Sequence, residues 1–362
     1  MDKNKEDSFD SISRKWKDKL DKSSEYEVVK DEFEVDSETF IPSTVPYTEY
    51  REALKLKNEL IKRFEGKSLK EIIEGEEIQT DRGVCYKIEK EDYINFNIIN
   101  PEIAKSKILR ELKLVFGIGE VTEDILRSEG YDTIEDLCKH PRFSFQATKL
   151  IEILNECNSQ EIERWITHWV PKTHPLVLCT SSFHENEKFI ILDIESFGLF
   201  SRPIILIGIA LVSNNNILIR QYLIRDISEE PAVLSAFLSN IDDNSVFVTF
   251  NGKAFDLPYI KERLAYYGMY EELSHPHFDI LHFSRRAWKQ GIPDHRLTTL
   301  EKYLFGIYRK DDIPSALVPE FYEVYMRSRN PGVLIPIVEH NRQDLLTLAN
   351  IFSKLHEEWG KW

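Results

Sequence analysis

The 362-residue sequence has little cysteine and no long apolar run. Its four cysteines, Cys85, Cys138, Cys157 and Cys179, are widely spaced and form no Cys-x-x-Cys pair. This spacing argues against a zinc ribbon or an iron–sulfur cluster and is typical of the reducing cytoplasm. The longest apolar run, residues 203–212, is far shorter than the roughly 20 residues that span a membrane.

The sequence also lacks a secretory signal, because its first 30 residues are polar and mixed in charge. No repeat and no low-complexity tract is present. Together with the cysteine spacing, these absences predict a cytoplasmic protein with no membrane partner. The composition, 42% apolar and 30% charged, is typical of a globular chain long enough for two domains.

A basic excess is missing too, since the formal net charge is −15. Proteins that bind nucleic acid through its phosphates usually present a basic surface, so we expect only weak long-range attraction to nucleic acid. One segment of 26 residues nevertheless holds Trp288, Tyr308 and the cations Arg285, Arg286, Lys289, Arg296, Lys302, Arg309 and Lys310. Cations interleaved with aromatic rings suit a single strand. A solvated helix face is the alternative.

Two acids end an apolar run of strand type, residues 189–192. Asp193 and Glu195 are two residues apart, and such residues point to the same side of a strand. Burying several carboxylates together is costly unless positive charge lies between them. Mg²⁺ or Mn²⁺ would supply that charge, because hard cations prefer oxygen ligands. Two such ions about 4 Å apart are typical of phosphoryl-transfer sites.

Two further acids, Asp256 and Asp344, follow later in the sequence. Asp256 comes after a second predicted strand, residues 245–250, and begins a helical pattern; a simple helix N-cap is the alternative. Asp344 lies in the amphipathic stretch 333–355, one helical turn after His340. A His beside a metal-binding Asp can accept a proton from water. A solvated helix face would explain the same spacing. Only the ordered combination of all these residues favours a metal site.

In this order, the stretches DIES, NGKAFDLPYI and EHNRQDLLTL resemble the DEDD (DnaQ-like) 3′–5′ exonucleases, which have a ribonuclease H-like fold. Within that group, residues 187–356 most resemble the YprB-like proteins. The resemblance implies two Mg²⁺ or Mn²⁺ ions bound by Asp193, Glu195, Asp256 and Asp344, all four also catalytic. It places His340 in the position of the base. His340 precedes its Asp by four residues, however, which is the spacing of the tyrosine branch; the His of the DnaQ-like branch precedes its Asp by five.

The motifs and the basic segment also predict residues that contact nucleic acid. They are Phe197, Asn251, Arg285, Arg286, Trp288, Lys289 and Arg296. Phe197 follows the first acidic motif and would stack on a terminal base, or else pack beneath the site.

The element pattern predicts an α/β protein. Strands at 189–194, 204–212, 217–224 and 245–250 enclose one helix at 231–240, and four helices begin near 280, 297, 314 and 333. This alternation predicts a ribonuclease H-like mixed sheet flanked by helices in the C-terminal part, residues 180–360.

Before this part we expect a mostly helical domain, residues 46–170, with a β-hairpin at 77–89. Residues 112–138 resemble a helix-hairpin-helix motif, which binds a backbone phosphate at a helix N-terminus. Acidic residues 120, 123 and 124 would compete with that phosphate, so a purely structural hairpin is the alternative. Residues 1–45 are predicted to be a poorly ordered polar leader.

These features predict a metal-dependent 3′–5′ exonuclease acting on single-stranded DNA or RNA. A nuclease-like binding or docking module with weak catalysis is the alternative, and an endonuclease of ribonuclease H type is a third. The sequence favours neither DNA nor RNA and gives no oligomeric state.

Overall fold

The computed structural model describes residues 45–361 except 157, 200 and 214. The chain divides into two compact units, residues 1–55 and 56–362. The predicted polar leader, residues 1–45, lies outside the described residues apart from its last residue. The helical pattern that follows it forms α2 (Tyr47–Arg63) and the short α3 (Leu69–Ile72).

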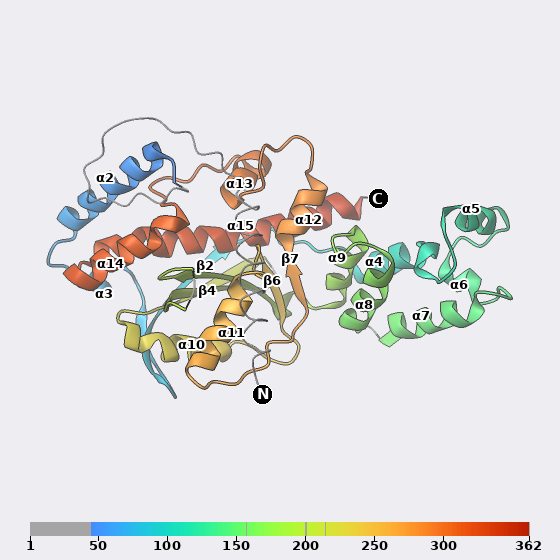
Figure 1. Cartoon of the computed structure of the whole chain (residues 1–362), viewed down its shortest axis with the longest axis horizontal. Coiled ribbons are helices and arrows are strands. Elements are labelled where there is room, and N and C mark those ends of the chain that lie inside the picture. The colour runs from blue at the N-terminus through green and yellow to red at the C-terminus, as the bar shows by residue number, and fades with distance from the viewer. Residues whose placement is uncertain (1–44, 157, 200, 214, 362) are drawn as a thin grey trace, which may run out of the picture. The chain divides into compact units, whose positions relative to one another are not determined.

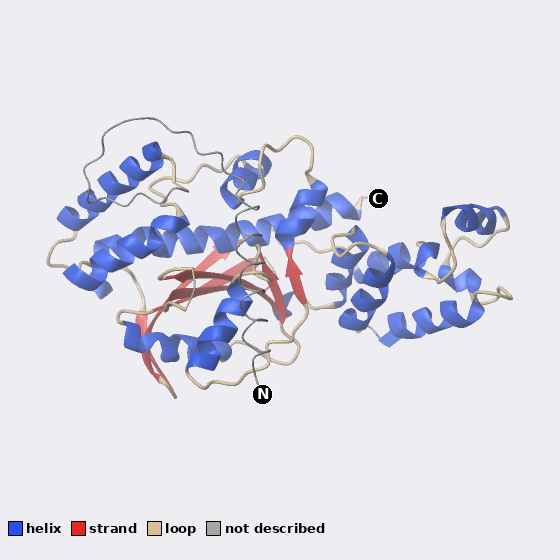
Figure 2. Cartoon of the chain, in the orientation of Figure 1, coloured by secondary structure: helices blue, strands red, loops and turns tan. Residues whose placement is uncertain are grey.

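A seven-stranded mixed sheet lies between helices in the larger unit (Figures 1 and 2). Its strands are β1 (Glu76–Thr80), β2 (Gly83–Tyr93), β3 (Phe189–Ser196), β4 (Ile204–Ser213), β5 (Asn216–Leu223), β6 (Val246–Thr249) and β7 (His277–Asp279). Their order is β1-β2-β5-β4-β3-β6-β7. The pairs β3–β6 and β6–β7 are parallel, and the other pairs are antiparallel. The predicted mixed sheet is thus confirmed, with β3 near its middle.

The predicted hairpin forms β1 and β2, but it belongs to the sheet. The β2 residues from Tyr86 to Tyr93 pair with β5, whose other edge pairs with β4. Without β2, the backbone groups along one side of β5 would lack partners. The hairpin therefore extends the sheet, although 95 residues (94–188) separate it from β3 in the sequence.

Two faces of the sheet carry different helices. On one face lies α15 (Ile335–Gly360), which packs against the side chains that include Ile191 and Ala210. On the other face lies α10 (Glu230–Leu238), where Asn240 just after the helix bonds Tyr222 of β5. The remaining helices of this part are α11 (Asp256–Tyr266), α12 (Ile280–Ala287), α13 (Leu297–Phe305) and α14 (Val318–Ser328). The helices predicted near 231, 280, 297, 314 and 333 are therefore present.

Helices also make up the segment between the hairpin and β3. They are α4 (Pro101–Leu109), α5 (Glu120–Ser128), α6 (Ile134–Leu137), α7 (Ser144–Glu156), α8 (Ser159–Trp169) and α9 (Pro175–Cys179). Their buried residues, such as Leu112 and Leu150, belong to the same apolar cluster as Phe189 of β3. Within the described residues, no helix is long and apolar enough to cross a membrane.

Candidate functional site

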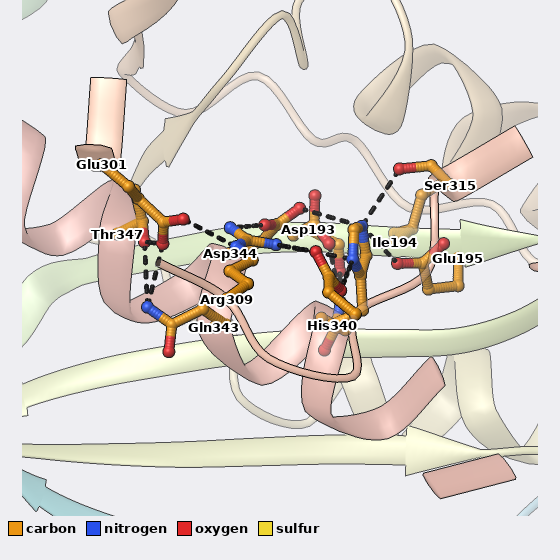
Figure 3. Close-up of polar contacts among 12 residues, drawn as sticks. Asp193, Ile194, Glu195, Glu301, Arg309, Ser315, His340, Gln343, Asp344 and Thr347 are labelled. Carbon is orange, nitrogen blue, oxygen red and sulfur yellow. Dashed lines mark hydrogen bonds and ion pairs between the residues drawn. The ribbon is translucent and has the colours of Figure 1, made fainter. Parts of the chain in front are cut away.

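The first two predicted acids lie at the end of β3, on the face that α15 covers. Asp193 is partly buried and Glu195 is only 6% exposed. Regular pairing of β3 with β4 continues to Glu195 and shifts at Ser196. Because both side chains project from the same face of a buried strand, the two carboxylates lie close to each other and to α15 (Figure 3).

The third acid, Asp256, is the first residue of α11 and is 6% exposed. Phe255 occupies the N-cap position, so the interpretation of Asp256 as an N-cap is wrong. Its carboxylate instead accepts a hydrogen bond from the backbone N–H of Ile194, at 3.2 Å. Ile194 lies between the two acids of β3, and this bond places Asp256 beside both of them.

A turn between β6 and α11 sets the position of Asp256. Asn251 adopts a left-handed conformation with φ 66°, which Asn tolerates better than most residues. A Cβ on Gly252 would lie 2.5 Å from the Thr249 side chain, so only glycine fits there. The Asp279 carboxylate accepts the N–H groups of Asn251 at 2.8 Å and Lys253 at 3.1 Å. Asp279 also caps α12, where its side chain accepts the N–H of Leu281.

The fourth acid and the predicted base lie one turn apart on α15. His340 Nε2 lies 3.6 Å from Asp344 Oδ2 and 3.9 Å from Glu195 Oε1. Ser315 Oγ lies 3.0 Å from the same Nε2. The other ring nitrogen, Nδ1, lies 2.6 Å from Asp312 Oδ1. The imidazole therefore has polar partners at both ring nitrogens (Figure 3).

A buried arginine that the sequence placed elsewhere also lies in the site. Arg309 was expected in the basic segment, but its side chain is only 8% exposed and lies among acids. Its guanidinium donates to the Asp344 carboxylate and, at 2.6 Å, to the fully buried Glu301. Asp312 Oδ2 lies 3.4 Å away. No sequence signal separates Arg309 from the neighbouring surface cations, whereas the structure assigns it to the acid cluster.

The electrostatics show that the acids share a site. Burial raises the pKa of Asp193 well above its usual range, and the charges of Asp344 and Glu195 raise it further. Burial likewise raises the pKa of Glu195 to about 8 and that of Asp256 to about 7. Carboxylates that repel one another in a buried place hold protons in this way when no other cation is bound.

Two opposing effects act on the pKa of His340. Burial alone would lower its pKa, but the Asp344 charge and the Asp312 hydrogen bond raise the pKa to about 10. Burial would raise the pKa of Asp312, yet the bond from His340 holds it below its usual value. The imidazole is therefore protonated at neutral pH in the metal-free site, which is not the form that accepts a proton.

The donor set suits hard divalent cations by its chemistry. Six carboxylates gather here, those of Asp193, Glu195, Asp256, Glu301, Asp312 and Asp344. Arg309 and His340 neutralise two of these charges, and two divalent ions would balance the other four. Among the described residues, however, no three His, Cys, Asp or Glu side chains are already arranged to hold an ion.

The predicted nucleic-acid contacts lie in several places. Phe197 packs edge-on against Tyr322, with ring centroids 5.7 Å apart. Trp288 is half-buried against the apolar core, which favours packing over stacking on a base. The other five, Asn251, Arg285, Arg286, Lys289 and Arg296, are exposed. Asn251 lies in the turn before α11, Arg285 and Arg286 in the last turn of α12, Lys289 just after it, and Arg296 at the N-cap of α13.

Comparison with protein families agrees with this fold. Residues 190–356 match the model of the RNase_H superfamily, a stretch that includes all four acids and His340. This part of the chain is therefore a ribonuclease H-like domain. Nucleases of this superfamily generally use divalent metal ions.

A more specific relationship comes from a curated relative, the uncharacterised protein YprB of Bacillus subtilis (strain 168). The two sequences are 34% identical over 203 residues, which cover 55% of this chain and 49% of YprB. The chain thus matches about half the length of this relative. The chain is therefore similar to YprB over about half its length, and it carries a ribonuclease H-like domain at residues 190–356.

Proposed function

We propose that this protein is a metal-dependent exonuclease that removes nucleotides from the 3′ end of single-stranded DNA or RNA. The observation that supports this most is the convergence of Asp193 and Glu195 from β3, Asp256 from α11 and Asp344 from α15. Burial, and then the neighbouring carboxylates, raise the pKa values of Asp193, Glu195 and Asp256. A fold gains nothing from such a concentration of acidic groups unless cations bind there.

In this proposal the four acids hold two Mg²⁺ or Mn²⁺ ions. Bound ions of this kind neutralise the scissile phosphate and lower the pKa of an attacking water. Asp312 orients His340 through Nδ1, so that Nε2 faces Glu195 and Asp344. His340 would accept the water's proton after losing its own. The exposed cations of α12 would contact the phosphate backbone of the single-stranded nucleic acid.

The first prediction concerns Asp193. Asp193→Asn removes a proposed metal ligand and also relieves carboxylate repulsion, so we expect cleavage to be lost while the fold remains as stable or becomes more stable. Cleavage is measured with 5′-labelled single-stranded DNA and RNA in Mn²⁺ or EDTA. A metal-dependent ladder that shortens from the 3′ end, absent in the variant, supports the proposal. Cleavage by Asp193→Asn at the wild-type rate would disprove it, and internal cuts would indicate an endonuclease.

The second candidate function is a nucleic-acid-binding or docking module with weak catalysis. The side chains of Arg309 and His340 favour it, because they already compensate part of the acidic charge. Thermal unfolding separates the two functions. An ion that binds only the folded protein raises its melting temperature. An unchanged melting temperature in millimolar Mn²⁺ would therefore favour the binding module.

A further inference from the structure

A line of three paired residues crosses the sheet beside the acids. Asp193 in β3 pairs with Gly208 in β4, and Gly208 pairs with Gln221 in β5. Paired residues in neighbouring strands project to the same face of a sheet. The side chains of Asp193 and Gln221 therefore lie on either side of a position that has no side chain.

Asn341 of α15 fills the space above Gly208. A Cβ built on Gly208 would lie only 2.0 Å from Asn341 Oδ1 and 2.8 Å from its Nδ2, so no larger residue fits without moving the asparagine. Asn341 is fully buried. Its Nδ2 donates to the Asp193 carboxylate at 2.7 Å and to the Asp193 backbone carbonyl at 3.1 Å. The Asn341 amide thus bonds both the carboxylate and the backbone carbonyl of Asp193.

The hydrogen bonds behind Asn341 fix which end of its amide faces Asp193. Gln221 Nε2 lies 2.8 Å from the carbonyl oxygen of Val338, which can only accept, so this atom must be the donating nitrogen. The same Nε2 donates to Asn341 Oδ1, at 2.8 Å. The opposite end of Asn341 is therefore its NH₂ group, which points at the carboxylate. A flipped amide would place its oxygen against the Asp193 backbone carbonyl and its nitrogen against Gln221 Nε2, and it would lose both of these bonds.

We infer that Asn341 is a positioning residue that holds the Asp193 carboxylate in the orientation required to bind a divalent cation. The inference rests on the proposed function, since it assigns Asn341 a role toward the same metal site. Asn341 satisfies one oxygen of Asp193 and leaves the other oxygen of that carboxylate for the ion. Gln221 and Gly208 act through Asn341: one sets the polarity of the amide, and the other leaves room for it.

The test measures Mn²⁺ binding by titration calorimetry, independently of cleavage. Loss of a hydrogen-bonded partner of a metal ligand typically weakens metal affinity about tenfold to a hundredfold. We expect a loss of this size in Asn341→Ala. Asn350→Ala is the matched control, because Asn350 is on the same helix and, within the part of the chain that the structure describes, its side chain bonds the carbonyl of Leu346, at 2.9 Å. This control should bind Mn²⁺ like the wild type.

A second pair of variants separates positioning from packing. Gly208→Ala forces Asn341 out of its place, so it should weaken Mn²⁺ binding as Asn341→Ala does. In the double variant Gly208→Ala/Asn341→Ala, the new methyl group fills part of the space that the asparagine leaves. We expect the double variant to regain thermal stability in EDTA relative to either single variant, while its Mn²⁺ affinity stays low. If a single variant is too unstable to measure, the double variant still distinguishes positioning of Asp193 from packing.

Two results would overturn the inference while leaving the proposed function in place. One is wild-type Mn²⁺ affinity in Asn341→Ala. The other is a double variant that recovers affinity together with stability, because Asn341 would then contribute packing alone. If the wild type itself binds no Mn²⁺ and cleaves no strand, the proposed function fails first, and the inference fails with it.

Discussion

Arg309 places a fixed positive charge beside a proposed metal ligand. Its guanidinium bonds Asp344, which is a proposed metal ligand, and it is anchored by Glu301, which is fully buried. Like charges a few ångströms apart repel by an amount on the order of a few kcal/mol where the protein partly excludes water. A divalent ion bound at Asp344 would therefore lie close to a charge that opposes it.

We predict that removing this charge strengthens metal binding. Arg309→Met alone would leave the Glu301 carboxylate buried and unpaired, at a cost of about 3–5 kcal/mol. The variant to measure is therefore Arg309→Met/Glu301→Gln, for which we expect Mn²⁺ to bind about tenfold more tightly than to the wild type. Arg342→Met is the control, since Arg342 bonds Asp92 and Glu339 outside the acid cluster. Weaker binding in the double variant would mean that Arg309 orients Asp344 instead of opposing the ion.

Sequence alone could predict the four acids but not this arginine. Each acid lies in a short motif next to a predicted strand or helix, so the local sequence is enough to identify it as a candidate. Arg309 lies among cations such as Lys302 and Lys310, and its burial depends on contacts with Glu301 of α13 and Asp344 of α15. Asn341 was missed for a related reason, because its partners Asp193 and Gln221 lie on two different strands.

At the scale of elements, the segment made up of β6, the turn that follows it and α11 positions Asp256 in the site. Three backbone N–H groups converge on the Asp279 carboxylate, those of Asn251, Lys253 and Leu281. The turn begins with a left-handed residue and cannot accept a side chain at Gly252. The start of α11 is therefore set by β7, through Asp279, as well as by its own sequence.

We predict that Asp279→Asn loosens this segment. An amide NH₂ cannot accept the N–H groups that the carboxylate now accepts, so the free energy of unfolding should fall by about 1–3 kcal/mol. A displaced Asp256 should also lower the cleavage rate about tenfold to a hundredfold, since small misplacements at a reacting centre have effects of this size. Asp294→Asn is the control, because Asp294 accepts the N–H of Arg296 before α13. A less stable variant that cleaves at the full rate would show that the turn does not position Asp256.

The positions of the strands were largely predictable from the sequence, whereas their pairing in the sheet was less so. Apolar runs such as 204–212 and 217–224 predict strands from local pattern alone, and both strands are present with nearly the expected bounds. The hairpin at 77–89 was predicted as well, but its pairing with β5 was not. Its residues carry no local signal for which edge they join, since pairing across more than a hundred residues depends on which edge the finished sheet leaves open.

At the scale of the whole molecule, the acid cluster should make the stability of the metal-free protein depend on pH. The pKa of Glu195 is raised to about 8 and that of His340 to about 10, while Asp193 is raised well above its usual range. A group whose pKa is higher in the folded state stabilises the fold while it is protonated, and this stabilisation is lost as the pH rises through the folded pKa.

Buried histidines act in the opposite direction, but at lower pH. Burial lowers the pKa of His174 and His184 to about 4, and that of His277 and His356 to about 3. Their contribution to stability is complete once the pH exceeds the ordinary histidine value, roughly 6.5. Between pH 7 and 9 the acid cluster and His340 should therefore dominate the change.

We predict that the protein in EDTA loses about 2–5 kcal/mol of unfolding free energy between pH 7 and 9, measured by urea denaturation. Mg²⁺ should reverse much of this loss, because it binds the carboxylates only when they are ionised and so stabilises the folded protein more at pH 9 than at pH 7. Glu195→Gln/His340→Gln removes two of the titrating groups and should flatten the dependence in EDTA. Equal stability of the wild type at both pH values, with no added effect of Mg²⁺ at pH 9, would mean that the acids do not form one coupled cation site.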